Sequence, residues 1–205
     1  MGRVCNATVG EIKMKMYKIK IKSASPMLHH GSQSVGMEKV ELKKKGGTAL
    51  LGDSEEWKKT IYFDEKVGVH LPASVFEACL INAGKQFKVT GRKTATEYIK
   101  SGVFCMEECL PFLVDGSPIK TLDDERIIID KRTTKNPSTR GRNMRYRARF
   151  DKWSSEFTIM VNSDDYITSD LLKEIIKYAG MFVGVGDYRP RFGRFMLDNF
   201  KEVSA

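Results

Sequence analysis

The sequence has no apolar run long enough to span a membrane, and residues 1–16 contain no hydrophobic stretch of the kind found in signal peptides. Only four cysteines occur among 205 residues, too few and too irregularly spaced for a disulfide framework. Cys105 and Cys109 could supply half of a metal site, but no second pair or nearby histidine completes it. P-loop, nucleophile and zinc-hydrolase motifs are missing too. We expect a cytoplasmic protein with no membrane partner, no cofactor and no metal.

Acidic residues are fewer than basic ones, and this imbalance indicates the class of partner. Lysine and arginine total 35 against 26 aspartate and glutamate residues, which gives a formal charge of +9 and a pI near 9.3. Such a charge favours a polyanion, with nucleic acid ahead of an anionic membrane surface. The apolar share of 41% is ordinary for a globular chain, so we expect residues 1–205 to form a single domain.

Two segments have the periodicity of amphipathic helices. In the first, apolar residues recur at helical spacing from Ala73 to Gly84, and Pro72 suits the first turn of that helix. In the second, Thr168 offers N-cap chemistry and Gly180 marks the predicted end. The matching apolar offsets of the two helices are a weak repeat signal.

Strand patterns surround these helices. Tyr17, Ile19 and Ile21 alternate with lysines, which predicts one buried and one basic face. Further extended segments are expected at 103–114, 127–129, 157–161 and 192–197. The order fits an α+β, ferredoxin-like (RRM-like) βαββαβ fold, an antiparallel sheet with helices on one face and the other face open to a ligand. Polar and basic segments at about 32–59 and 126–149 are predicted to be inserted loops or hairpins.

The segment from Arg126 to Arg149 carries nine basic residues and one acid, Asp130. Such a density of cations favours a phosphate backbone, since each neutralised phosphate releases a counterion. Tyr146 within the run offers a ring on which a base could stack. We interpret the segment as a loop that orders on its ligand. The alternative is a solvated basic loop or hairpin that has no ligand.

A second glycine-rich, basic segment runs from Gly184 to Phe195. Gly184 and Gly186 predict backbone geometries that a Cβ would obstruct, with N–H groups turned inward toward phosphate. Three arginines, at 189, 191 and 194, add charge to the same turn. The segment is no Rossmann fingerprint, because it follows a helix and precedes a strand. A tight connection with no ligand is the alternative.

Three short motifs together resemble the RAMP superfamily, the guide-RNA-binding and processing subunits of CRISPR systems. Gly184, Gly186, Gly193 and Phe195 are similar to the family's C-terminal glycine-rich loop. Two more segments, Ser25–Gly31 and Leu71–Phe76, resemble its first-strand turn and the entry to its first helix. An uncharacterised phage-encoded relative that ends in the same loop is an alternative identity.

The resemblance implies that the sheet and the glycine loop bind a single strand, and that the segment Arg126–Arg149 corresponds to a projecting hairpin of the backbone subunits. The chain departs from the family in two ways. It is smaller than the usual guide-RNA backbone subunit, and the segment His29–Gly36 lacks the acidic residue of target-cleaving members. Some RAMP endoribonucleases use a histidine in this region.

The preferred hypothesis is a sequence-tolerant binder of single-stranded RNA or DNA that assembles along the strand as a homo-oligomer or filament. One alternative is a metal-independent endoribonuclease that uses His29 or His30. A second is a structural or interaction protein. The candidate nucleic-acid-binding residues are Lys18, Lys20, Lys22, His29, His30, Arg132, Arg140, Arg142, Arg145, Tyr146, Arg147, Gly184, Gly186, Arg189, Arg191 and Arg194.

Overall fold

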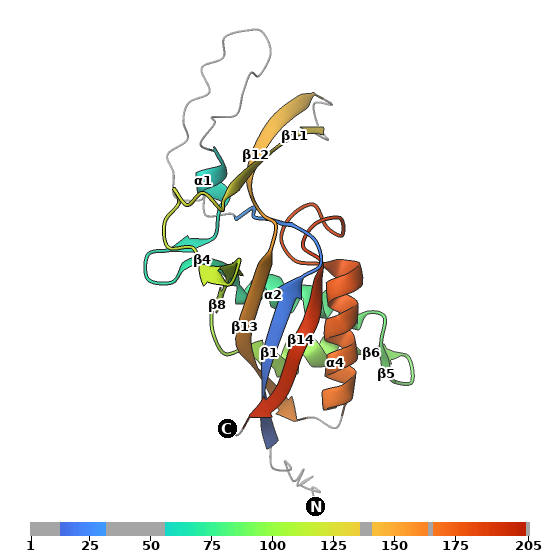
Figure 1. Ribbon diagram of the computed structural model, residues 1–205. Coiled ribbons are helices and arrows are strands. Elements are labelled where there is room, and N and C mark those ends of the chain that lie inside the picture. The colour runs from blue at the N-terminus through green and yellow to red at the C-terminus, as the bar shows by residue number, and fades with distance from the viewer. Residues whose placement is uncertain (1–12, 32–55, 136–140, 164–165, 204–205) are drawn as a thin grey trace, which may run out of the picture.

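A central antiparallel sheet organises the protein, which is represented by a computed structural model (Figure 1). In the middle of the sheet, β1 (Lys13–Ser23) pairs with β13 (Trp153–Ser163) on one side and β14 (Phe195–Val203) on the other. The residues that the structure describes are 13–31, 56–135, 141–163 and 166–203. Predictions for other positions, which include most of the 32–59 insertion and Arg140, lie outside this set.

The other edge of β13 completes the sheet. It pairs with two short strands, β7 (Val103–Cys105) and β9 (Leu113–Val114), and β9 pairs in turn with β10 (Ser117–Pro118). Strands therefore follow the spatial order last, first, third and second of a βαββαβ unit. The predicted ferredoxin-like α+β fold is confirmed.

The alternation in β1 gives the sheet one apolar face. Tyr17, Ile19 and Ile21 are at most 2% exposed, whereas the lysines between them lie on the opposite face. From β13, Phe157 points into the same core and stacks edge-on against Phe76 of the first long helix, with 4.8 Å between ring centroids. Burial of one face against helices is thus the main reason that this strand sits in the middle of the sheet.

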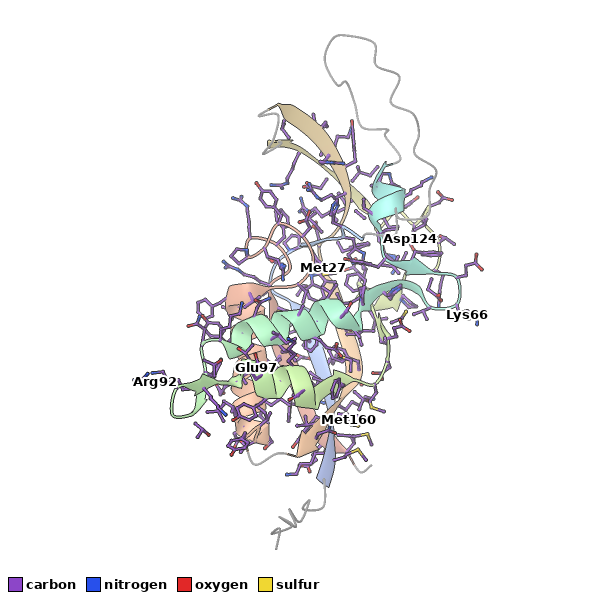
Figure 2. The ribbon with its side chains drawn as sticks, turned by 180° about the vertical axis from the view of Figure 1, so that it is seen from behind. Met27, Lys66, Arg92, Glu97, Asp124 and Met160 are labelled. Carbon is purple, nitrogen blue, oxygen red and sulfur yellow. The ribbon has the colours of Figure 1, made fainter. Side chains whose placement is uncertain are left out.

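Three helices pack on the apolar face. Helices α2 (Ala73–Gly84) and α3 (Ala95–Gly102) lie across the back of the sheet (Figure 2), and α4 (Ser169–Tyr178) runs beside β14 (Figure 1). The bounds predicted for α2 are confirmed, while α3 was not predicted. No helix among the described residues is long and apolar enough to cross a membrane.

The end predicted for the last helix is wrong. The chain continues past Gly180 in a π-helical turn, η2 (Ala179–Val183), before it reaches Gly184. Gly180 has a packing role instead, because a Cβ on it would lie 2.1 Å from the carbonyl oxygen of Phe195. The missing side chain lets the first residue of β14 approach the helix.

A long hairpin projects from the sheet, and we call it the arm (Figure 1). It consists of β11 (Ile128–Lys135) and β12 (Arg142–Phe150), and α1 (Glu56–Thr60) packs beside it. The extended segment predicted at 127–129 overlaps the start of β11, where Ile127 is buried while Ile128 and Ile129 are each 42% exposed. The 126–149 segment is a hairpin, one of the two forms expected for an insertion.

Smaller strands form two further groups outside the central sheet. One group contains β3 (Phe63–Asp64), β4 (Gly68–Pro72) and β8 (Cys109–Pro111), and a separate hairpin contains β5 (Lys88–Thr90) and β6 (Lys93–Thr94). Buried residues of the sheet, the helices and the base of the arm belong to one apolar cluster. The arm is therefore anchored in the same core as the sheet.

Candidate nucleic-acid interface

The two RAMP-like motifs at opposite ends of the sequence lie against each other. We call residues 184–194 the glycine loop and residues 24–31 the first-strand turn. The N–H of Gly193 donates to the carbonyl of Pro26 at 2.8 Å, and that of Asp187 donates to the carbonyl of Leu28 at 2.9 Å. The N–H of Arg194 donates to Ser25 Oγ at 2.9 Å. These bonds fix the loop on the turn.

Glycine is required at three positions of the loop. Gly184, Gly186 and Gly193 have φ values of +74°, +78° and +75°, a region that side chains rarely adopt. A Cβ on Gly186 would lie 2.5 Å from the carbonyl oxygen of Leu28, and one on Gly193 would lie 1.6 Å from that of Val185. The predicted need for glycine at 184 and 186 is confirmed, by both dihedral angle and close approach.

The predicted phosphate nest of loop N–H groups needs correction. Most of the donors that glycine would free for an anion already bind carbonyl or hydroxyl oxygens inside the protein. The hydrogen-bonded N–H groups are those of Gly184, Val185, Asp187, Phe192, Gly193 and Arg194. Any anion that the loop attracts is therefore held mainly by side chains.

The arm also rests on the glycine loop. Arg147, which is 7% exposed, forms an ion pair with Asp187 of the loop, with Nε and Oδ2 2.5 Å apart. The guanidinium of Arg132 lies 4.6 Å from the ring centroid of Phe192 and 5.5 Å from that of Tyr188. Three segments that are far apart in the sequence, the first-strand turn, the arm and the loop, thus meet in one place.

Two adjoining cavities run between the glycine loop and the exposed side of α2, and we call them together the loop groove. The larger, of about 590 Å³, includes Asn82 of α2, and the smaller, of about 250 Å³, includes Ser74 and Ala78. Both are lined by Gly186, Asp187 and Arg189.

The cations of the glycine loop are exposed, and one of them, Arg189, lines the groove. Arg189, Arg191 and Arg194 all face solvent, and none of them forms an ion pair with a carboxylate of a described residue. Arg194 is partly held, because its Nε donates to the carbonyl of Pro190 at 2.8 Å. Three exposed guanidinium groups on one loop can bind phosphate through charge-assisted hydrogen bonds.

The two candidate histidines have different environments. His29 is fully buried, with its ring centroid 5.0 Å from that of Tyr62 and 4.7 Å from that of Phe150. Its Nδ1 accepts a hydrogen bond from the Tyr62 N–H at 3.3 Å. Burial, with a smaller repulsion from His70, lowers the pKa of His29 to about 3. His29 is therefore a neutral core residue, and its predicted role in binding or catalysis is wrong.

His30, the next residue, is exposed. It lines the smaller cavity of the loop groove together with Tyr62 and Arg189. The Tyr62 hydroxyl donates to the His30 carbonyl at 3.3 Å, which ties this part of the first-strand turn to the cavity wall. His30 alone of the pair stays a candidate for a site in the groove.

Two candidate residues of the arm point into the protein. Tyr146 is 7% exposed, and Lys131 lies over its ring at 5.6 Å, so the ring is not the stacking surface that was predicted. Arg147 is buried in its ion pair with Asp187. Arg145 is exposed on the arm, whereas the side chain of Arg142 lies outside the described set.

The predicted basic face of β1 carries both signs of charge. Lys18 pairs with Glu156 at 2.8 Å, while Lys22 and Lys20 lie 2.7 and 3.9 Å from Asp198. Hydrogen bonds from Lys18 and Lys22 lower the pKa of Glu156 and of Asp198. These exposed pairs add little stability, but they partly neutralise the lysines. The open sheet face is thus less cationic than the glycine loop.

Comparison with solved structures shows a similarity of fold. No family model matches the chain, and no curated protein sequence matches it. A chain in the cryo-EM structure of the Type III-B Cmr-beta bound to cognate target RNA aligns with 94% of this chain, at 13% identity and a TM-score of 0.54. The fold is RAMP-like. The alignment covers 61% of the neighbouring chain, so the protein spans less than two thirds of its length.

A second structure is similar at a lower level. Cmr6 from Pyrococcus furiosus is 12% identical, and the alignment covers 91% of this chain and 99% of Cmr6. Its TM-score of 0.43 is too low to support a conclusion. A phage origin stays a prediction, because these structures concern the fold alone.

Three aromatic residues that line the groove were not among the predicted site residues. Tyr188 and Phe182 line the larger cavity and Tyr62 lines the smaller. A signal existed for Tyr188, because it stands between an acid and an arginine within the glycine-rich segment. The sequence did not indicate Tyr62, because its position in the smaller cavity depends on how the chain folds against the first-strand turn.

Burial of His29 predicts a pH dependence of stability. The ordinary histidine pKa of 6.5 falls to about 3 in the folded protein, so the unfolded chain binds a proton that the folded chain rejects. Stability is therefore full above pH 6.5 and is lost as the pH falls, with a slope of up to about 1.4 kcal/mol per pH unit. Carboxylates with lowered pKa contribute only below about pH 5.

The measurement is denaturant unfolding of the wild type and His29→Leu between pH 5 and 8. His30 and His70 are present in both proteins, so the difference between their slopes isolates His29. We expect the variant to be less stable at pH 8, because the Tyr62 N–H loses its acceptor. Below pH 6.5 its free energy of unfolding should depend less steeply on pH than that of the wild type. Parallel curves would show that His29 titrates normally.

Close approach at Gly186 predicts a loss of stability that a second glycine can calibrate. Gly116 has the same φ, +79°, but nothing lies within 4 Å of its virtual Cβ. Gly116→Ala should therefore cost only backbone strain, about 1 kcal/mol. Gly186→Ala adds the contact with the Leu28 carbonyl, which should cost roughly 1–3 kcal/mol more. Equal free energies of unfolding in the two variants would mean that the loop is not held tightly on the turn.

Proposed function

We propose that the protein binds single-stranded nucleic acid, with RNA preferred, along the loop groove. The observation that carries this proposal is the set of three exposed arginines of the glycine loop, Arg189, Arg191 and Arg194, which have no carboxylate partner among the described residues. Arg189 lines both cavities of the groove. A strand that neutralises the three arginines releases counterions, which drives binding without regard to sequence. The binding is therefore sequence-tolerant.

Two further facts support this proposal. The groove is bounded by a loop and a helix, a shape that suits a single backbone better than the two backbones of a duplex. The neighbour with a TM-score of 0.54 was solved with a bound target RNA, which favours RNA over DNA as the ligand.

Assembly of several copies along one strand is part of the proposal. The arm projects from the body of the protein and exposes apolar side chains, among them Ile128, Ile129 and Met144. Such side chains can pack against a neighbouring copy.

Removal of the loop arginines tests the proposal. Arg189→Ala, Arg191→Ala and Arg194→Ala combined should weaken binding of a labelled oligouridylate strongly and reduce the salt slope by about 0.7 per lost phosphate contact. The matched control is Lys88→Ala, Arg92→Ala and Lys93→Ala on the β5–β6 hairpin, which changes net charge equally (Figure 2). Melting temperatures of both variants should change little, since exposed substitutions usually cost below about 0.5 kcal/mol each.

Two further measurements test strand preference and assembly. Competing duplex should displace the strand poorly, and light scattering with a long oligonucleotide should show several copies on each strand. If both triple variants lose affinity equally, the groove is not the site. If duplex binds as tightly as the single strand, the preference is wrong. A monomer on the long strand would remove the assembly part alone.

We propose metal-independent cleavage of RNA as a second candidate function, because His30 and Arg189 line one cavity. In this reaction the His30 imidazole takes the proton of a ribose 2′-hydroxyl, the 2′-oxygen attacks the adjacent phosphorus, and Arg189 stabilises the added negative charge. The P–O5′ bond breaks and the 5′-oxygen takes a proton from solvent water, while His30 returns its own proton to solvent. The products are a 2′,3′-cyclic phosphate and a 5′-hydroxyl.

Cleavage is tested with labelled RNA in the presence of a chelator. Wild type should cut, His30→Asn should bind with unchanged affinity but not cut, and a strand with 2′-deoxy sugars should resist. Intact RNA after long incubation with wild type would reject this second function and would leave the binding proposal standing.

A further inference from the structure

One residue of the glycine loop has a backbone conformation that its side chain does not favour. Tyr188 has a φ of +58°, in the left-handed region where glycine or asparagine is normally found. Burial does not compensate for this, because the side chain is 48% exposed. Strained conformations that packing does not explain gather at functional sites. A role for the aromatic ring on the surface accounts for the choice of tyrosine.

Contacts with the arm hold the Tyr188 ring in place. The Arg132 guanidinium lies 5.5 Å from the centroid of the ring and is itself fixed by Asp130, with Nε and Oδ1 2.7 Å apart. Phe192 packs edge-on against Tyr188 at 6.1 Å. An exposed ring that is fixed in this way loses little rotational freedom when a flat ligand stacks on it.

A second exposed aromatic ring lines the same cavity. Phe182 is 63% exposed and belongs to the π-helical turn η2, a distortion that is frequent at functional sites. Tyr178 packs against Phe182, with 4.6 Å between their ring centroids. Phe182 and Tyr188 thus both border the larger cavity of the loop groove, whose volume of about 590 Å³ is typical of ligand pockets.

The polar groups of this cavity suit one kind of ligand. Arg189 supplies an exposed positive charge beside the rings. Asn82 is occupied, because its amide donates to the Ala78 carbonyl and accepts from Lys85 Nζ, each at 2.9 Å. The exposed aromatic rings and the cation favour a flat apolar group joined to a phosphate. Because the Asn82 amide is already occupied, it does not form hydrogen bonds with the edge of that group.

We infer that Tyr188 and Phe182 form a stacking site for one unpaired nucleobase, whose phosphate lies against Arg189. The inference rests on the proposed function and adds a base-dependent part to it. Arginine contacts give affinity for the backbone, and the two rings give affinity for a base of any identity. Duplex is disfavoured because its bases are already stacked.

The test compares an oligouridylate with an abasic strand of the same length and charge. Stacking on an aromatic side chain contributes about 1–3 kcal/mol per base, so Tyr188→Ala should weaken oligouridylate binding by roughly 5-fold to 150-fold. The same variant should bind the abasic strand as wild type does, with an unchanged salt slope. Phe182→Ala should behave likewise, and Tyr188→Phe should retain affinity.

A second pair of variants separates binding from folding. Tyr188→Gly relieves the backbone strain that Tyr188→Ala retains, so it should melt at a higher temperature than Tyr188→Ala while losing as much affinity. Tyr166→Ala, at an exposed tyrosine near the start of α4, is the control for loss of any surface aromatic and should bind normally. The fluorescence of an oligouridylate that carries 2-aminopurine should be quenched when wild type binds it, and should not be quenched by Tyr188→Ala.

The two hypotheses fail in different ways. If wild type binds neither the oligouridylate nor the abasic strand, the proposed function fails. If wild type binds both, and Tyr188→Ala and Phe182→Ala bind both equally well, the stacking site alone is wrong and the backbone contacts suffice.

Discussion

Met27 and Leu28 form the junction on which the candidate site depends. They make up the short strand β2, which pairs with β12 at the base of the arm, and the Leu28 carbonyl accepts the N–H of Asp187 from the glycine loop. Both side chains are fully buried, and Figure 2 places Met27 between the helices and the arm. Because backbone hydrogen bonds join β2 to both neighbours, arm and loop cannot move independently while the strand stays in place.

This junction also explains the distribution of charge and aromatic rings. Residues that face it lose their surface role: His29 becomes a neutral core residue and Arg147 an ion-pair partner of Asp187. Residues that face away, such as His30 and Arg189, line the groove. The alternation along extended backbone decides which of two adjacent residues does which. The packing of the core at this junction thus determines which basic side chains remain exposed on the surface.

Sequence periodicity predicted the elements whose burial is local. The alternation around Ile19 and the helical spacing from Ala73 to Gly84 each satisfy one apolar face, so β1 and α2 appear where expected. Helix α3 was missed because it is only eight residues long and buries only Ala95 and Ile99, too few positions for a helical repeat to be recognised. The glycine loop was recognisable because its positive φ angles demand glycine.

Partners that come from distant strands could not be predicted. Lys22 is separated from Asp198 by most of the chain, so the neutralisation of the β1 lysines was invisible in the sequence. The inward turn of Tyr146 was equally hidden, because β12 is basic on both sides of it and has no clear alternation. The structure was therefore needed to show that the loop arginines are better candidates for binding phosphate than the lysines of the sheet.

The bond between Arg194 N–H and Ser25 Oγ joins residues 169 positions apart. During synthesis the first-strand turn leaves the ribosome long before the loop that completes the groove exists, and contacts of such high sequence separation form late in folding. An unfinished or partly folded chain can therefore carry the same basic residues without offering the shaped surface. Only a fully folded chain would then present the groove, so that incompletely folded copies compete poorly for the ligand.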